Sequence, residues 1–418
     1  MIEAIAVEQL LAAAIHWPCA ALLHSGDQRD PYGEYDWLFA VGNHSHIQDQ
    51  ADLLAFDRWL ESHPEAFRFG VLCYDLRLRL GHLPDQHQQE QLLPDVAFFK
   101  ADVVVSCKNG VIRWERGSSE QLWGTSAPDA LEPQSVSWTF RTGMERNQYL
   151  KAFEAVRELL QQGELYEMNL CRPFWSELPN EAAQQTERLF LHMLRTNPAM
   201  QSGYFRCGDN VVISSSPERF LQRKGKQLLS EPIKGTAARH SDPKEDHNRK
   251  EQLRNNAKER SENVMIVDLV RNDLSRLCKA GSVVVDELFA IRTLAKVHQM
   301  VSIVRGQLEA EVPFSKILEA TYPMGSMTGA PKVAAMREID HLEVFRRGWY
   351  SGSLGYFSPH NTFDFNVLIR SLAMNRNKGL ALVGAGGAIT IQSEAEAEFH
   401  ETELKAISTI EAMGATVS

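Results

Sequence analysis

The stretch YFRCGDNVVISSSPERFLQRKGKQLLSEPIKGT, residues 204–236, contains two consecutive hairpin patterns. The first pair of apolar runs turns at Gly208 and Asp209, and the second turns at Lys224 and Gly225. Two-residue turns that contain glycine, between strand-like runs, indicate β-hairpins with antiparallel strands. Because helical patterns are interspersed with such strands along the chain, we expect an α+β fold of antiparallel sheets covered by helices.

The second hairpin leads directly to Lys234, which stands between Pro232 and Gly235. Proline restricts the backbone and glycine adopts conformations closed to other residues, so together they predict a short, shaped turn. A lysine in a turn is usually a solvated surface residue. The alternative is a nucleophile that the turn aims at a substrate.

The composition limits the classes of function. The chain has 418 residues, a net charge of −10 and 44% hydrophobic residues. Negative charge disfavours nucleic acid, so an anionic substrate needs a local positive site or a metal ion. No apolar run approaches the roughly 20 residues of a membrane span. The six cysteines form no C-x-x-C pair, so we expect a cytoplasmic protein with reduced thiols that binds neither nucleic acid nor membrane.

A polar stretch at residues 115–135, with several Gly, Ser and Pro residues, is the best candidate for a boundary. We therefore distinguish an N-terminal segment, residues 1–135, from a core, residues 136–418. Within the core, the pattern predicts one long helix over residues 243–277 and one strand over residues 363–374.

Two pairs of glutamates have the same spacing on predicted helices: Glu259 with Glu262, and Glu398 with Glu401. A separation of three places both carboxylates of a pair on one helix face. If the helices face each other, the four carboxylates require a cation, and oxygen ligands suit Mg²⁺. Solvated helix surface is the commoner outcome for such pairs, and Lys405 would also fit an ordinary ion pair with Glu401.

Three further residues carry candidate chemistry. Arg370 lies among apolar neighbours in its predicted strand, so its guanidinium needs a carboxylate, either from the protein or from a substrate. Glu218 ends a strand and could be a general acid if it is partly desolvated. His298 alternates with apolar residues, which is typical of a core histidine and also compatible with a catalytic one.

Two glycine-rich runs could hold an anion. Residues 325–331, GSMTGAP, enter a predicted helix whose free amides could bind negative charge. Residues 384–387, GAGG, follow a predicted strand. They are typical of a loop with accessible backbone amides or of a tight turn. Each run is weak evidence by itself.

Six motifs occur in this order: SPERF (216–220), PIKGT (232–236), KERSENVMIVDLVRNDL (258–274), GSMTGAPK (325–332), GAGGAI (384–389) and EAEFHETELKA (396–406). In this combination the chain resembles the chorismate-utilising enzymes, which include anthranilate, isochorismate and salicylate synthases. The resemblance covers roughly residues 145–412. It implies two large interleaved antiparallel β-sheets packed as a sandwich, with helices outside, the active site between the sheets, and both segments in one interwoven unit.

The resemblance also implies roles for the candidate residues. Glu262 and Glu401 match direct Mg²⁺ ligands, and Glu259 and Glu398 match residues that support the ion through water. Glu218 matches a general acid. The positions that match the chorismate-binding residues are Thr236, Tyr350, Arg370, Gly384, Gly386 and Lys405. His298 matches a histidine near the reacting ring.

The residue at Lys234 distinguishes branches of the family. Anthranilate synthases carry alanine there, whereas PIKGT resembles the branch that aminates chorismate to 4-amino-4-deoxychorismate, in para-aminobenzoate and folate biosynthesis. In that branch the lysine adds to the ring and ammonia later displaces it. Attack requires a neutral amine, so we expect the pKa of Lys234 to fall toward neutrality. No glutaminase signature appears, so ammonia is expected from a separate glutaminase subunit.

Glu167 leaves alternatives open. It occupies the position of the lysine base that activates water in isochorismate and salicylate synthases, and it also differs from the glutamine common in ammonia-using relatives. The alternatives are therefore anthranilate synthase or isochorismate/salicylate synthase activity, or a non-catalytic subunit that binds chorismate or tryptophan. Ser25 and Pro198 match tryptophan contacts, but His24 replaces the glutamate common in feedback-inhibited relatives.

Overall fold

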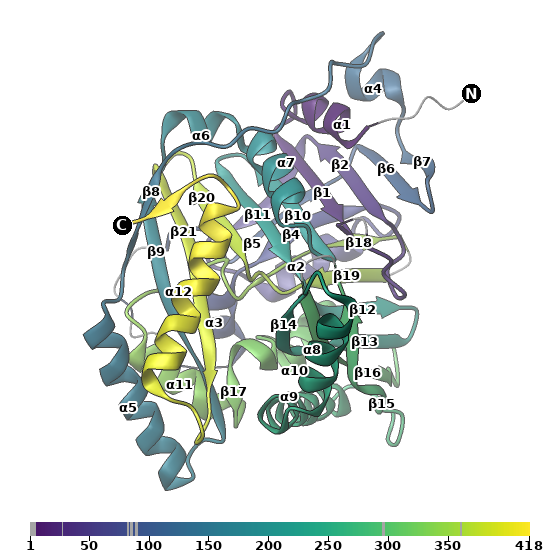
Figure 1. Cartoon of the computed structure of the whole chain (residues 1–418). Coiled ribbons are helices and arrows are strands. Elements are labelled where there is room, and N and C mark those ends of the chain that lie inside the picture. The colour runs from purple at the N-terminus through teal and green to yellow at the C-terminus, as the bar shows by residue number, and fades with distance from the viewer. Residues whose placement is uncertain are drawn as a thin grey trace.

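The computed structural model describes residues 6–26, 28–81, 83, 87, 91–294, 297–359 and 362–418. Its strands form two large sheets with helices on the outside (Figure 1). The first sheet has 12 strands in the order β22 (Thr416–Val417), β8 (Thr139–Thr142), β9 (Glu167–Glu177), β21 (Leu380–Ile389), β20 (Ser371–Asn375), β11 (Asn210–Ser216), β10 (Gln201–Cys207), β1 (Cys19–His24), β2 (Trp37–Gly42), β6 (Val103–Lys108) and β7 (Val111–Arg116), with β17 (Gly329–Ala330) paired to β9.

The second sheet has 10 strands in the order β14 (Ile233–Ala238), β16 (Val297–Gln307), β13 (Gln227–Glu231), β12 (Arg219–Lys224), β19 (Thr362–Asn366), β18 (Ser353–Ser358), β4 (Arg68–Leu72), β5 (Val96–Lys100) and β3 (His44–Gln48), with β15 (Val284–Thr293) paired to β16. Paired strands are antiparallel except for β22 and β8, which are parallel. The predicted α+β architecture of two large sheets is confirmed.

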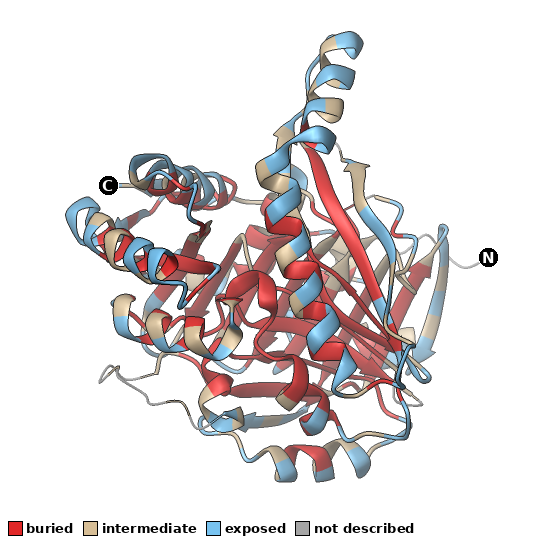
Figure 2. Cartoon of the chain, turned by 90° about the horizontal axis from the view of Figure 1, so that it is seen from below, coloured by how far each residue is buried: buried red, intermediate tan, exposed pale blue. Residues whose placement is uncertain are grey.

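The helices are α1 (Val7–Ala14), α2 (Leu53–Glu61), η1 (Tyr74–Leu76), α3 (Arg77–Leu80), α4 (Ser119–Trp123), α5 (Arg146–Gln162), α6 (Asn180–Gln184), α7 (Thr186–Thr196), α8 (Pro243–Asn255), α9 (Ala257–Ser275), α10 (Phe314–Thr321), η2 (Gly325–Met327), α11 (Lys332–Leu342) and α12 (Ala395–Glu411). Figure 2 shows the buried residues concentrated in the strands, whereas the helices turn exposed faces outward. No helix of the described part is long and apolar enough to cross a bilayer.

The two sheets pack through an apolar layer. Phe99 of β5 stacks on Phe205 of β10 with ring centroids 5.9 Å apart, and Trp349 meets Phe205 edge-on at the same distance. All three rings are fully buried, and burial of such apolar area is the main stabilising contribution to a fold of this kind. Polar side chains replace this apolar layer where β9 approaches β14, as described below.

Strands from the N-terminal segment enter both sheets. β1 pairs with β10 in the first sheet, and β4 pairs with β18 in the second. The N-terminal strands are therefore hydrogen-bonded to strands of the core. The division at residue 135 itself stays a prediction.

The predicted hairpins are present. Cys207 pairs with Asn210, which leaves Gly208 and Asp209 in the first turn as predicted. Lys224 pairs with Gln227, so the second turn consists of Gly225 and Lys226 and lies one residue later than predicted. Both glycines have positive φ, +59° and +58°, the conformation that favours glycine in such turns.

Two predicted elements were wrong. The helix over residues 243–277 is two helices, because the side chain of Asn256 accepts a hydrogen bond from the Glu259 amide, 3.1 Å away, and starts α9. The strand over residues 363–374 is also two elements. β19 ends at Asn366 and β20 begins at Ser371, and the chain crosses between them from one sheet to the other.

Candidate active site

Lys234 meets Glu167 between the two sheets. Lys234 lies on β14 of the second sheet and Glu167 begins β9 of the first. Lys234 Nζ donates to Glu167 Oε1 over 2.8 Å, and the side chains are only 11% and 0% exposed. The second carboxylate oxygen of Glu167 is buried and has no hydrogen-bond partner among the described residues. The stretch that reads as a turn thus places its lysine in a buried polar site.

Gly235 determines the backbone conformation next to Lys234. The pairing of β14 with β16 shifts register between Ile233 and Thr236, and Gly235 has φ +82°. A Cβ on Gly235 would lie 2.9 Å from Glu259 Oε2. Only glycine therefore allows both this backbone conformation and the close approach of Glu259.

The electrostatic surroundings hold Lys234 protonated in the free protein. Burial acts to lower the pKa of Lys234, but the carboxylates of Glu167, Glu262 and Glu218 act in the other direction, and the pKa is raised overall. This is opposite to the fall expected from the sequence. The difference arises because the sequence does not show that an ion pair with Glu167 forms across the sheets.

Glu218 has the properties of a general acid. It lies between β11 and β12 and is 5% exposed. Burial raises the pKa of Glu218 to about 7, against the opposing effects of the Ser326 hydroxyl and the Lys234 ammonium. A carboxyl group with a pKa near neutrality can carry a proton to a leaving group. The structure thus brings the predicted acid, nucleophile and Glu167 into one buried region.

The four glutamates of the predicted metal site divide into a buried pair and a less buried pair. Glu262 on α9 and Glu398 on α12 are 8% and 3% exposed, whereas Glu259 is half-buried. Lys258 Nζ lies 3.8 Å from Glu262 and 3.4 Å from Glu398, so one ammonium group links the two helices. Glu401 is exposed and is paired to Lys405 at 2.7 Å.

These carboxylates fit a hard cation by their donor chemistry. Glu262 Oε1 is buried without a hydrogen-bond partner among the described residues, and burial raises the pKa of Glu262 to about 7. Both observations indicate a carboxylate that lacks sufficient positive charge. No group of three His, Cys, Asp or Glu side chains in the described residues is already arranged as a metal site, so Mg²⁺ stays a prediction.

Arg370 stands where the chain crosses between the sheets. Its φ of +50° is unusual for a residue other than glycine. Arg370 is half-buried and burial lowers the pKa of its guanidinium, yet no hydrogen bond or ion pair of this group occurs within the described residues. Of the two alternatives from the sequence, an internal ion pair is therefore absent there, and the guanidinium is available to an external carboxylate.

The glycine run is part of a strand, not the loop that the sequence suggested. Gly384 and Gly386 lie within β21, which pairs with β9 along its whole length. A Cβ on Gly384 would lie 2.3 Å from the Tyr350 ring, and one on Gly386 would lie 2.4 Å from Cys171 Sγ. Glycine is therefore required for packing, and Lys405 Nζ ties α12 to the strand by donating to the Gly386 carbonyl over 2.9 Å.

The remaining predicted residues lie at the edge of this region. Thr236 is exposed on β14. His298 is buried, its Nδ1 is 3.0 Å from Thr293 Oγ1, and its Nε2 is 3.1 Å from Asp246 Oδ1. Both ring nitrogens are thus occupied, which matches a satisfied core histidine. A catalytic role for His298 stays a prediction with no contact here to support it.

Two residues of the site have no assigned role in the sequence analysis. Lys258 is one of them, and its position four residues before Glu262 on a helix was an available signal. Arg347 is the other: it is 1% exposed, pairs with Glu343 at 2.6 Å, and donates to the Met327 and Asn169 carbonyls. It ties the loop of the GSMTGAP run to β9, and no local pattern indicated this.

Comparisons with known proteins identify the family of the chain. The family model described as chorismate binding enzyme matches residues 12–411. Aminodeoxychorismate synthase component 1 of Salmonella typhimurium is 34% identical, over 95% of this chain and 93% of that protein. The protein of the same name from Escherichia coli is also 34% identical, over 95% and 94%. Aminodeoxychorismate synthase of Streptomyces pristinaespiralis is 42% identical, over 84% of this chain and 52% of that protein.

Solved structures show the same fold at lower identity. Anthranilate synthase component I from Streptococcus pneumoniae is 24% identical with a TM-score of 0.76, over 91% of this chain and 93% of that one. The menaquinone-specific isochorismate synthase MenF from Escherichia coli is 20% identical with a TM-score of 0.75, over 98% and 92%. With a family model that matches almost the whole chain, the chain belongs to the chorismate binding enzyme family.

Proposed function

We propose that this protein aminates chorismate to 4-amino-4-deoxychorismate, with ammonia from a separate glutaminase subunit, in the cytoplasm and as a step toward para-aminobenzoate and folate. The observation that carries the proposal is the buried Lys234 between the sheets, with Glu218 nearby. The names of relatives at 34% identity over nearly the whole chain support the same reaction. The word component in those names supports a partner subunit.

The first step forms a covalent bond to the enzyme. Arg370 holds a carboxylate of chorismate, and the neutral amine of Lys234 adds at ring carbon 2. Both ring double bonds shift by one position, the bond from carbon 4 to oxygen breaks, and Glu218 gives its proton to the hydroxyl, which leaves as water. Lys234 Nζ must lose its proton before the attack, and the ion pair with Glu167 Oε1 at 2.8 Å opposes this loss by raising the pKa of Lys234.

The second step releases the enzyme. Ammonia adds at carbon 4, both double bonds shift back, and the bond between carbon 2 and Lys234 breaks, so Lys234 leaves as the free amine. The buried position of Lys234 excludes water from the carbon that it occupies. Glu167 replaces the lysine base of the water-using relatives, which further favours amination.

The carboxylates of Glu262 and Glu401 would hold Mg²⁺ directly, supported through water by Glu259 and Glu398. When bound, Mg²⁺ supplies positive charge for a substrate carboxylate. Lys258 lies near both Glu262 and Glu398, so its ammonium supplies positive charge to both carboxylates.

Product identification tests the proposal. The purified chain, given chorismate, Mg²⁺ and an ammonium salt, should form 4-amino-4-deoxychorismate, and glutamine should not replace the ammonium salt. Anthranilate or isochorismate as the main product would contradict the assignment. Robust glutamine-dependent turnover by the chain alone would contradict the separate glutaminase.

A further inference from the structure

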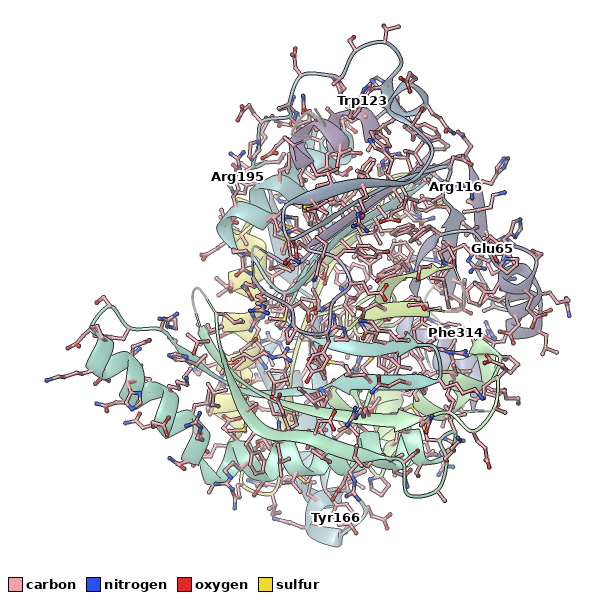
Figure 3. All side chains as sticks on the ribbon, turned by 90° about the vertical axis from the view of Figure 1, so that its right-hand side faces the viewer. Glu65, Arg116, Trp123, Tyr166, Arg195 and Phe314 are labelled. Carbon is pink, nitrogen blue, oxygen red and sulfur yellow. The ribbon has the colours of Figure 1, made fainter. Side chains whose placement is uncertain are left out.

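A second cavity lies apart from the candidate active site. It has a volume of about 320 Å³ and is lined by residues of α2, β4, β12, α10 and the hairpin of β18 and β19. None of its lining residues belongs to the site described above. In Figure 3, Phe314 of this cavity lies well apart from Tyr166, the neighbour of Glu167 in the chain. The cavity is therefore a separate feature of the fold.

Arg68 gives the cavity an uncompensated positive charge. The residue is 2% exposed, and one guanidinium nitrogen donates to the Leu60 carbonyl at the end of α2. Its Nε has no hydrogen-bond partner, and no ion pair of Arg68 occurs within the described residues. Burial lowers the pKa of Arg68 to about 10. A buried cation without a counter-ion is costly, and an anion in the cavity would reduce that cost.

A second arginine of the cavity also favours a negatively charged ligand. Arg223 is 4% exposed and pairs with Glu311 at 2.6 Å. The Glu311 side chain is 68% exposed, and an ion pair to so exposed a partner contributes little, so it can give way to a ligand carboxylate.

The other acidic groups of the cavity do not neutralise Arg68. Asp57 accepts hydrogen bonds from both the amide, at 3.0 Å, and the hydroxyl of Ser315. Glu61 is exposed at the last position of α2. Neither forms an ion pair with Arg68 in the described structure, so the guanidinium stays open on its unpartnered side.

The rest of the wall is aromatic. Phe314 meets Phe357 at 4.8 Å and Phe363 at 5.2 Å between ring centroids, both edge-on. The Arg68 guanidinium lies over the Phe357 ring, 5.5 Å from its centroid. Such a wall accepts a flat apolar body, and small-molecule sites start at about 300 Å³.

We propose that this cavity binds a small aromatic monocarboxylate, with its carboxylate on Arg68 and its ring against Phe357 and Phe363. The inference does not depend on the proposed function. It differs from a purely structural role, in which Arg68 only caps the C-terminal end of α2 and no ligand enters.

The test is a titration of the full chain with 4-fluorobenzoate, followed by ¹⁹F NMR. Because Arg370 also offers a guanidinium, binding is compared in wild type, Arg370→Gln, Arg68→Gln and Val312→Trp. Val312 is a half-buried residue of the cavity wall, so tryptophan there blocks the space without removing the charge.

We expect binding to persist in Arg370→Gln and to weaken at least about tenfold in Arg68→Gln and Val312→Trp. The uncharged 4-fluorobenzamide should bind wild type at least about tenfold more weakly than 4-fluorobenzoate. If Arg68→Gln does not fold, Val312→Trp and the amide decide the question. The proposal is overturned by absence of binding to wild type, by unchanged affinity in the cavity variants, or by equal affinity for the amide.

Discussion

Lys234 Nζ and Glu167 Oε1 lie 2.8 Å apart although their strands belong to different sheets. The pair joins the two sheets at the position where the apolar side chains between them are replaced by polar ones. It also connects the proposed nucleophile to the residue whose role the resemblance leaves open. For the proposed attack, Lys234 has to lose the proton that this ion pair stabilises.

Glu167→Gln should retain amination and change its pH dependence. Glu167 contributes to the raised pKa of Lys234, so its replacement should lower that pKa. Because the free amine is the reactive form, the rising limb of kcat/KM should move to lower pH. The measurement is the pH profile of both proteins with an ammonium salt. Loss of activity as large as in a Lys234 variant would show instead that this carboxylate accepts an obligatory proton.

Glu218→Gln should remove the break of the pH profile near neutrality. The active form combines a neutral Lys234, whose pKa is raised, with a protonated Glu218. kcat/KM of the wild type should therefore rise with pH and level off at about pH 7, the pKa to which burial raises Glu218. Glutamine cannot donate the proton, and loss of a general acid lowers the rate by about 10²- to 10⁴-fold. A variant with full activity and an unchanged break near pH 7 would exclude Glu218 as the acid.

Glu262→Gln and Glu401→Gln should each abolish turnover and Mg²⁺-dependent binding of chorismate while the fold stays intact. Among the described residues the buried Oε1 of Glu262 accepts no hydrogen bond, and its one ion pair, with Lys258, is long at 3.8 Å, so its replacement should not unfold the protein. The measurements are activity and chorismate affinity across a Mg²⁺ titration. Glu411→Gln, an exposed glutamate at the end of α12, is the matched control. Unchanged Mg²⁺ dependence in both site variants would exclude the predicted metal site.

Arg370→Gln should raise the KM for chorismate and leave stability almost unchanged. A hydrogen bond to a charged group contributes about 1.5–3 kcal/mol, which corresponds to a rise of about 10- to 150-fold. The guanidinium has no partner within the described residues, so the midpoint of denaturation should stay near that of wild type. Arg376→Gln, in the turn after β20, is the control. A large loss of stability with an unchanged KM would assign Arg370 a structural role.

The sequence predicted the elements that are determined by residues close to one another in the chain. The turn at Gly208 follows from the residues that form it, and the glutamate pairs follow from helical spacing. The glycines of residues 384–387 were assigned to a loop because glycine is rare in strands. Glycine is required at Gly384 and Gly386 because the Tyr350 ring and Cys171 Sγ, which belong to other elements, leave no room for a Cβ. A local sequence pattern does not show such contacts.

The site depends even more on contacts between distant segments. Lys234 and Glu167 are 67 residues apart, and hydrophobic periodicity cannot show which side chains meet across a sandwich. Arg370 lies in the segment that crosses between the sheets. Its apolar neighbours give this segment the sequence pattern of a strand. The resemblance to a family identified these residues, whereas the ion pair that raises the pKa of Lys234 required the structure.

The central claim is that Lys234 becomes covalently attached to the substrate. Enzyme is quenched during turnover with chorismate and Mg²⁺ but without ammonia, and the peptide that contains Lys234 is examined by mass spectrometry. We predict a chorismate-derived adduct on that peptide in wild type and in the control Lys226→Ala, which changes an exposed lysine of the second hairpin turn. Lys234→Ala should show no adduct and no formation of 4-amino-4-deoxychorismate. Near wild-type amination by Lys234→Ala, or amination by wild type without any adduct, would contradict the account.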